Sequence, residues 1–232
     1  MKAAALACLL SIAGVAQVFE AAALKPNDSG SPQATVYHYP GRVVATNNTV
    51  AAYLIWAFQI NQYQLSGPKW LESDRYDLNA KFPDGTPRDA VPKMLRALLT
   101  EQFHLQVRRE IRQMPALALV PARSGVKLQA SQGAMKTNSA GPALFRATRA
   151  RLPELAEHLS NVLGRPVVDG TGLTGEYDLD LRWASETPGP EPPSGPSLAT
   201  ALQEQLGLRL ESRKAPIEML VIDRADRTPS GN

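Results

Sequence analysis

Cysteine is almost absent from this sequence of 232 residues, which contains a single one, Cys8, within an apolar N-terminal stretch. A chain that loses this stretch has no cysteine left. It can then form no disulfide, carry no thiol nucleophile and bind no metal through sulfur. The folded protein must therefore be stabilised by packing, without covalent cross-links.

The sequence also lacks segments in which charges of one sign are concentrated. The 25 lysine and arginine residues nearly balance the 22 aspartate and glutamate residues, the net charge is +3, and no run of five like charges occurs. Nucleic-acid binders gather positive charge on one face or segment, and acidic interaction tails gather negative charge. We therefore expect no nucleic-acid partner. The hydrophobic share of 44% is that of an ordinary globular protein with one domain or two small ones.

Long apolar runs are confined to the N-terminus. Lys2 precedes an apolar stretch over residues 3–13, and residues 14–16 (Gly-Val-Ala) are small enough for cleavage by signal peptidase. A buried N-terminal helix is the alternative, but a polar, strand-like segment follows at once and favours a signal peptide over residues 1–16. No later stretch is apolar enough to span a membrane. The sequence therefore predicts an exported protein, periplasmic or extracellular, with no membrane span after signal cleavage.

The mature sequence repeats short motifs at a nearly constant interval. The longest is Tyr-Asp-Leu, which occurs at residues 76–78 and again at 177–179, an offset of 101. Three further matches follow at offsets of 101 to 103: Ala-Thr at 45–46 and 147–148, Gln102-Phe103 with Gln205-Leu206, and Pro115 with Pro216. Ordered matches at one interval are typical of a tandem duplication.

Each copy is predicted to contain the same order of elements. A short strand ends at Ala45-Thr46 or at Ala147-Thr148, and an amphipathic helix follows, with apolar residues at i, i+3, i+4 and i+7. A second strand, a second helix and a hairpin complete each copy, with the hairpins expected over residues 104–122 and 208–225. The predicted fold is thus α+β, two tandem β-α-ββ-α-ββ units with a mainly antiparallel sheet and helices on one face.

The second strand of each copy alternates apolar and polar side chains. The apolar face consists of Tyr76, Leu78, Ala80 and Phe82 in the first copy, and of Tyr177, Leu179, Leu181 and Trp183 in the second. The opposite face carries charged or amide side chains such as Asp178. Because a strand has only two faces, we expect the apolar set, Tyr177 included, to lie in the core and Asp178 to be exposed.

These patterns divide the chain into four parts. Residues 1–16 are the signal peptide, residues 17–121 the first repeat, residues 122–142 a linker and residues 143–232 the second repeat. The linker and a loop over residues 185–196 are rich in proline, glycine or serine. Such segments are expected to be irregular and exposed.

No residues are spaced for binding a metal or a cofactor. The three histidines, His38, His104 and His158, are far apart, and none has a second ligand at the spacing of a metal site. The sequence also lacks the nucleophile elbow GxSxG, the zinc motif HExxH, a phosphate-binding loop and a dinucleotide fingerprint. We therefore expect no cofactor, no metal and no catalytic residue that a known motif would identify.

Two weaker candidates for a site remain. Asp169 begins an Asp-Gly-Thr-Gly segment, for which a glycine-rich turn is the simpler interpretation. A pair of carboxylates, Asp169 with Glu176, stays open as the site of a hydrolase, provided that burial holds one of them protonated. Trp70 is the candidate for a surface contact with a ligand, because no repeat partner places it in a core, as Phe82 does for Trp183.

Six segments that cover nearly the whole mature chain resemble a known family: FEAAALKPN, ATNNTVAAYLIWAF, LSGPKWLESDRYDLNAK, MLRALLTEQFHLQVRRE, LGRPVVDGTGLTGEYDLDLRW and LATALQEQLGLRLESRKAPIEMLVIDR. The family is that of soil-associated exported proteins of unknown function in acidobacterial genomes, with a Solibacter-type domain. The resemblance implies no assigned active site. One segment departs from it, since residues 31–45 are shorter and less glycine-rich than in other members.

Two further resemblances bear on function. Related domains are attached to membrane metallopeptidase sensors of the beta-lactam-response type. The strand-helix-strand units also resemble the short N-terminal domain of secretins and TonB-dependent receptors. Both resemblances imply a binding or signalling module of the cell envelope.

The sequence thus favours a non-catalytic envelope module that binds an envelope protein or a wall-derived ligand. Its support is a signal peptide, an antiparallel sheet with edges and the lack of a catalytic constellation, and strand addition at a sheet edge is a common mode of such recognition. The alternative is a secreted hydrolase with a carboxylate site between the repeats. Two carboxylates in a deep pocket would favour the hydrolase, whereas a free strand edge would favour the binding module.

Overall fold

A computed structural model of the protein describes residues 18–184 and 195–230. The predicted signal peptide (residues 1–16) and most of the predicted proline-rich loop (residues 185–196) lie outside the described residues. The described chain combines helices with mainly antiparallel strands, which confirms the predicted α+β class. No helix in this part of the chain is long and apolar enough to cross a membrane.

The chain forms two compact units. The first unit groups described residues of the ranges Met1–Gln59, Lys69–Gln106 and Arg224–Asn232, and the second groups Ile60–Pro68 and Val107–Asp223. This grouping crosses the predicted repeat boundaries. The second unit takes in part of the first repeat, and the first unit takes in the C-terminal residues.

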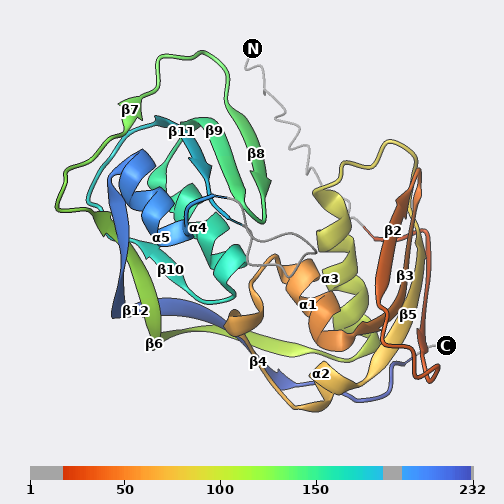
Figure 1. Ribbon diagram of the computed structural model, residues 1–232. Helices are drawn as coiled ribbons and strands as arrows, with labels where there is room; N and C mark the ends of the chain where they lie inside the picture. The colour runs from red at the N-terminus through yellow and green to blue at the C-terminus, as the bar shows by residue number, and fades with distance from the viewer. Residues whose placement is uncertain (1–17, 185–194, 231–232) are drawn as a thin grey trace, which may run out of the picture. The chain divides into compact units, whose positions relative to one another are not determined.

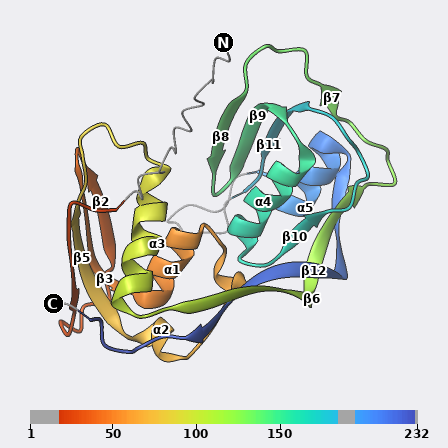
Figure 2. The same cartoon turned by 180° about the vertical axis from the view of Figure 1, so that it is seen from behind.

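The first unit contains an antiparallel sheet of four strands in the order β1-β5-β3-β2, called here the first-unit sheet. Its strands are β1 (Ala21–Pro26), β2 (Thr35–Tyr39), β3 (Arg42–Thr49) and β5 (Arg75–Lys81). Helices α1 (Val50–Phe58) and α3 (Ala90–Gln102) cover one face of this sheet, and the short helix α2 (Trp70–Ser73) precedes β5 (Figures 1 and 2). Strands β1 and β2 are its edges.

The helix predicted in the first copy is confirmed as α1. Thr49 is its N-cap, and the Thr49 hydroxyl accepts a hydrogen bond from the amide of Ala52 at 3.1 Å. The apolar stripe of the helix is buried. Tyr53 in this stripe is 1% exposed, and its hydroxyl donates a hydrogen bond to the carbonyl of Tyr76 at 3.0 Å. The one polar atom of the stripe therefore enters the core with a partner.

The second unit contains a sheet with a matching strand order. This second-unit sheet has the order β7-β11-β9-β8 and is also antiparallel throughout. Its strands are β7 (Gln129–Ala130), β8 (Thr137–Gly141), β9 (Leu144–Ala150) and β11 (Tyr177–Arg182). Helix α4 (Leu152–Leu163) has Pro153 in its first turn and Gly164 just past its end, the usual pattern at helix ends. The short helix α5 (Leu198–Ala201) continues into a π-helical turn over Leu202–Leu206.

Strands β7 and β8 both lie within residues 122–142, the predicted linker. Most of the other residues of this segment are irregular. Strand β8 pairs with β9 across a tight turn, and β7 pairs with β11. The segment therefore supplies both edges of the second-unit sheet in addition to linking the repeats.

The two predicted hairpins are wrong. Each segment forms one continuous strand instead, β6 (Gln106–Pro121) and β12 (Leu208–Arg224). These are neighbours in a third sheet of order β10-β6-β12-β4, in which β10 (Val167–Asp169) pairs in parallel with β6, and β4 (Leu65–Ser66) pairs in parallel with β12. Neither long segment contains the glycine that a two-residue hairpin turn usually needs, so nothing local reverses the chain.

The predicted alternation of β5 and β11 is confirmed with one exception. The apolar face is buried at Tyr76, Leu78, Ala80, Phe82, Leu179, Leu181 and Trp183. Tyr177 is the exception, because it is only half-buried and its hydroxyl donates to the carbonyl of Thr174 at 3.2 Å. The register shift between Tyr177 and Leu179 does not account for this, because β5 and β3 shift in the same way beside the buried Tyr76. The ring of Phe103 covers Tyr76, with centroids 5.5 Å apart, whereas the repeat counterpart of Phe103 is the smaller Leu206.

The repeated aspartates Asp77 and Asp178 both support an irregularity in the neighbouring strand. Asn47 in β3 (φ 59°) and Arg149 in β9 (φ 54°) have left-handed backbone where these strands shift register. Asp77 accepts a hydrogen bond from the Asn47 amide at 2.8 Å, and Asp178 accepts one from the Arg149 amide at 3.2 Å. Each aspartate thus satisfies the amide of a strained residue, which gives a structural role to the repeated Tyr-Asp-Leu motif.

Candidate functional site

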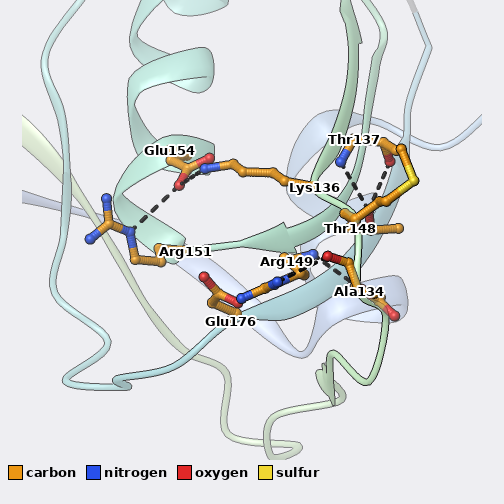
Figure 3. Close-up of polar contacts among 10 residues, drawn as sticks. Ala134, Lys136, Thr137, Thr148, Arg149, Arg151, Glu154 and Glu176 are labelled. Carbon is orange, nitrogen blue, oxygen red and sulfur yellow. Dashed lines mark hydrogen bonds and ion pairs between the residues drawn. The ribbon is translucent and has the colours of Figure 1, made fainter.

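The two carboxylates of the predicted hydrolase site are each held by local contacts. Asp169 ends β10, and its Oδ1 accepts hydrogen bonds from the amide of Thr171 at 2.9 Å and from the Thr171 hydroxyl at 2.7 Å. This is the turn that the glycine-rich segment favoured. Glu176 is exposed and pairs with the guanidinium of Arg149 at 2.6 Å, as Figure 3 shows. One carboxylate therefore holds a turn, and the other balances a surface cation.

The polar groups near Glu176 have structural roles as well. Lys136 forms an ion pair with Glu154 at 2.7 Å, and Arg151 lies 3.6 Å from the same carboxylate (Figure 3). Partial burial tends to raise the pKa of Glu154, but the hydrogen bond from Lys136 and those from Arg151 outweigh it and lower the pKa. A general acid needs the opposite shift, so Glu154 is an ion-pair partner.

The three histidines are not brought together. His104 follows α3, and its Nδ1 lies 2.9 Å from an aspartate oxygen. His158 on α4 packs between Phe145 and Trp183, with ring centroids 5.1 and 6.1 Å away, and burial lowers its pKa. His38 lies in β2. Among the described residues, no three histidine, cysteine, aspartate or glutamate side chains are grouped so that they could hold a metal ion.

Trp70, the predicted surface contact, begins α2 and is half-buried. Its ring lies 6.1 Å from the ring of Phe103, which is fully buried. Part of the indole therefore packs against the core of the first unit, and only the remainder is accessible to a ligand.

A hollow in the first unit opens beside the edge strand β2, and we call it the β2 hollow. It has a volume of about 490 Å³ and is lined by His38, Tyr39, Pro40, Gly41, Trp56, Phe82, Gly85, Thr86, Arg88 and Val91. Its floor is apolar, because Phe82 is 8% exposed and Trp56 is half-buried. The rings of His38 and Trp56 meet edge to face with their centroids 5.5 Å apart. Volume and lining are in the range of sites that bind small ligands or side chains.

The β2 hollow contains a free cation and no acidic side chain. Arg88 lines it and is exposed, and within the part of the chain that the structure describes it has no hydrogen bond or ion pair. By contrast, Arg96 on α3 lies over the ring of Phe58 at 4.5 Å and donates to the carbonyl of Ala57 at 3.2 Å. The guanidinium of Arg88 is thus available to an anionic group of a ligand.

The two units differ in side-chain size at the positions around the hollow. Val43 and Phe82 of the first unit correspond to Phe145 and Trp183 of the second, at offsets of 102 and 101. In the second unit these larger rings pack on His158, the counterpart of Trp56. The first unit has smaller side chains at both positions and a larger one, Trp56, in place of His158. Phe82 and Trp56 line the hollow, and the fully buried Val43 does not.

Among the described strands, β2 pairs with β3 alone, so one of its two sides is paired and the other is open. Its turn to β3 consists of Pro40-Gly41, and Tyr39 is opposite Arg42. In a two-residue hairpin this flanking pair is hydrogen-bonded, so alternate residues counted back from Tyr39 face β3. The backbone N–H and C=O groups of Val36 and His38 therefore face the open edge.

Strand β2 is also apolar for an exposed edge. Val36, Tyr37 and Tyr39 are 42%, 55% and 53% exposed. The corresponding edge strand β8 reads Thr-Asn-Ser-Ala-Gly, with Lys136 directly before it. Polar and basic residues protect an edge against pairing, whereas an apolar edge is a template for another strand. Of these two corresponding edges, β2 is the one suited to a partner.

The sequence alone does not single out the residues of the β2 hollow. Trp56 and His38 have no motif around them, and Arg88 stands in a loop without a pattern. One signal was available in the repeat, because the smaller side chains Val43 and Phe82 face larger counterparts in the second copy. Without the sheet order, nothing relates those positions to β2.

Comparison with known proteins gives a family. The model of the family described as “Protein of unknown function (DUF3738)” matches residues 51–225, more than half of the chain. Comparison with curated proteins and comparison with solved structures gave no match. The predicted resemblance to a family of unknown function is thereby confirmed, whereas its acidobacterial and soil association stays a prediction. The matched span begins within α1 and leaves out β2 and its turn. The chain belongs to this DUF3738 family of proteins of unknown function.

Proposed function

We propose that the protein is a non-catalytic binding module of the cell envelope, exported to the periplasm or the cell exterior, whose ligand is an envelope protein or a wall-derived fragment. The observation that carries the proposal is the open, apolar edge of β2, where the backbone groups of Val36 and His38 are free to pair. A strand added there gains backbone hydrogen bonds without any reaction at a side chain. The signal peptide expected over residues 1–16 supports the location.

The contacts of the carboxylates favour binding over hydrolysis. A hydrolase of the alternative type needs one carboxylate kept protonated by burial or by a like charge nearby. Glu176 is exposed and paired with Arg149, and Asp169 holds its own turn. No observation on these residues supports the hydrolase, so the binding module is the function that we propose.

Val36→Pro tests the role of the edge. Proline lacks an N–H, but the N–H of Val36 faces away from β3, and edge strands accept proline at such positions. The matched control is Asn138→Pro, at offset 102 on the corresponding edge strand β8. The hairpin of β8 and β9 also has a two-residue turn, so counting back from Gly141 shows that the N–H of Asn138 faces away from β9.

The wild-type chain and both variants, each without residues 1–16, are immobilised and exposed separately to solubilised membrane proteins and to muropeptides from digested peptidoglycan. Mass spectrometry identifies what is retained, and binding is then measured with the purified ligand. The wild-type chain and Asn138→Pro should bind the same ligand, and Val36→Pro should bind it at least about tenfold more weakly. Equal binding by all three proteins would refute the role of the edge. No retention above an unrelated immobilised protein would refute the module.

A further inference from the structure

We infer that the β2 hollow binds the last residue of a protein C-terminus that pairs with β2 as an added strand, with the terminal carboxylate placed at Arg88. This inference rests on the proposed function and specifies which part of the partner is recognised. Three features of the hollow support it: its place at the end of the open edge, its apolar floor and its unpaired cation.

The hollow lies where a strand running along β2 would end. His38, the last residue whose backbone faces the open edge, lines the hollow. Beyond it, the Pro40-Gly41 turn packs closely on the chain after β5, so that a Cβ added at Gly41 would lie 2.6 Å from Oδ1 of Asp84 and 3.1 Å from the carbonyl oxygen of Phe82. A strand rises about 3.3 Å per residue, so three or four residues of a partner would reach from Val36 to the hollow. The turn borders the hollow there, which favours a chain end over a continuing strand.

The floor fits a large apolar side chain. Trp56 and Phe82 present aromatic surface, and Val91 adds an aliphatic contact. The volume of about 490 Å³ leaves room for one side chain together with a carboxylate and its hydration. Apolar floors of this kind supply affinity, while a few polar groups fix the orientation of the ligand.

The cation selects a chain terminus over an internal strand. A guanidinium binds a carboxylate through two parallel hydrogen bonds, and Arg88 has no such partner within the described chain. The backbone of an internal strand carries no charge, and an acidic side chain placed at Arg88 would leave the apolar floor uncovered. A muropeptide stem also ends in a carboxylate, but its last residue is an alanine or a diamino acid, which is too small or too polar to cover Trp56 and Phe82. The protein C-terminus is therefore the occupant that satisfies both the charge and the floor.

Selection from a random library tests the inference without knowledge of the partner. Seven random residues are displayed with a free C-terminus and selected against the chain that lacks residues 1–16. The wild-type chain should enrich peptides that end in a large apolar residue, whereas Arg88→Gln should enrich none of them. The control Arg123→Gln removes an exposed arginine of the second unit and should select the same peptides as the wild type. Thermal unfolding verifies that both variants are folded.

A selected peptide is then synthesised twice, with a free carboxylate and with a C-terminal amide, and its binding is measured by fluorescence anisotropy. The amide should bind roughly 10- to 100-fold more weakly, as expected for the loss of a hydrogen-bonded charge. Arg88→Gln should weaken the acid by a similar factor and leave the amide unchanged. A muropeptide should bind more weakly than the selected acid.

Equal binding of acid and amide, or no enrichment above an unrelated protein, would overturn the inference. Either result would leave the proposed function standing if Val36→Pro still abolished binding of an envelope ligand. Conversely, the absence of any envelope ligand would refute the proposed function even if the library yielded peptides. The two failures are thus distinguishable.

Discussion

Replacement of Asp77 by alanine tests whether the repeated aspartates hold the irregular part of the neighbouring strand. Asp77 Oδ1 accepts two hydrogen bonds, from the amide of Asn47 at 2.8 Å and from Asn27 Nδ2 at 2.7 Å. Asn47 is 1% exposed and has a left-handed backbone, so its amide has little access to water after the change. An unsatisfied buried N–H costs about 1–3 kcal/mol, and the loss of the second bond adds about 1 kcal/mol.

Asp77→Ala should therefore lower the free energy of unfolding by about 2–4 kcal/mol. Asp178→Ala is the matched comparison, because Asp178 is exposed and accepts one bond, at 3.2 Å, from the amide of Arg149. Water can replace that bond, so the change should cost only about 0.5–1 kcal/mol. Asp77→Asn keeps an acceptor oxygen and should recover most of the loss.

Urea denaturation gives the free energies, and amide hydrogen exchange at Asn47 gives a local measurement. Exchange at this amide should accelerate in Asp77→Ala and remain slow in Asp77→Asn. An equal cost at Asp77 and Asp178 would refute the reasoning, and so would unchanged exchange at Asn47 in Asp77→Ala. Asn79→Ala, on the same exposed strand face as Asp77, controls for changes in strand propensity.

Other predictions concern backbone, pH and export. Gly207→Ala should cost more than about 3 kcal/mol in urea denaturation, because Gly207 has a positive φ and a Cβ there would lie 2.1 Å from the carbonyl oxygen of Gly125. Gly164→Ala has a similar φ but open space, and should cost only about 1 kcal/mol. Burial lowers the pKa of His158, so the unfolded chain binds more protons. This contribution to stability is present above the unfolded pKa of about 6.5 and is lost as pH falls through the folded value. His158→Phe should therefore flatten the fall of the thermal midpoint below about pH 7. Expression in a Gram-negative host should give a periplasmic chain cleaved near Ala16, and mass spectrometry of an intact cytoplasmic chain would disprove export.

Helices were predictable because their signals are local. The N-cap Thr49 and the proline and glycine at the ends of α4 stand next to the elements that they delimit. The strand faces of β5 and β11 were predictable for a similar reason, because apolar and polar residues alternate along each strand and show which face is buried. Tyr177 departs because the cover of this position comes from a residue distant in the sequence: Phe103 packs on Tyr76 in the first unit, and its counterpart in the second copy is Leu206.

The long strands show what local patterns leave open. Strands β6 and β12 continue where hairpins were expected, because they are neighbours in one sheet and pair with each other, while β10 and β4 add three and two paired residues from distant parts of the chain. Parallel partners of two or three residues carry almost no signal of their own. The duplication remains a prediction, although the matching strand orders of the two antiparallel sheets agree with it.

The β2 hollow could not be predicted from the sequence, because it forms between elements that are separated along the chain. Its residues come from the end of β2, from α1 and from the loop before α3, and no spacing connects them. A motif search finds groups that perform chemistry. It does not find a hollow beside an edge strand, or an arginine such as Arg88 that has no partner among the described residues.

The space itself argues for an occupant. An apolar edge strand and an open aromatic floor are both unfavourable in an unbound protein. The edge promotes aggregation, and the floor leaves aromatic side chains without packing contacts. The second unit shows that the same strand order accommodates a polar edge at β8 and a corner packed by Phe145 and Trp183. The fold therefore does not require the arrangement of the first unit. Strand β2 lies outside the span matched by the family model, whereas Trp56, Phe82 and Arg88 of the hollow lie within it.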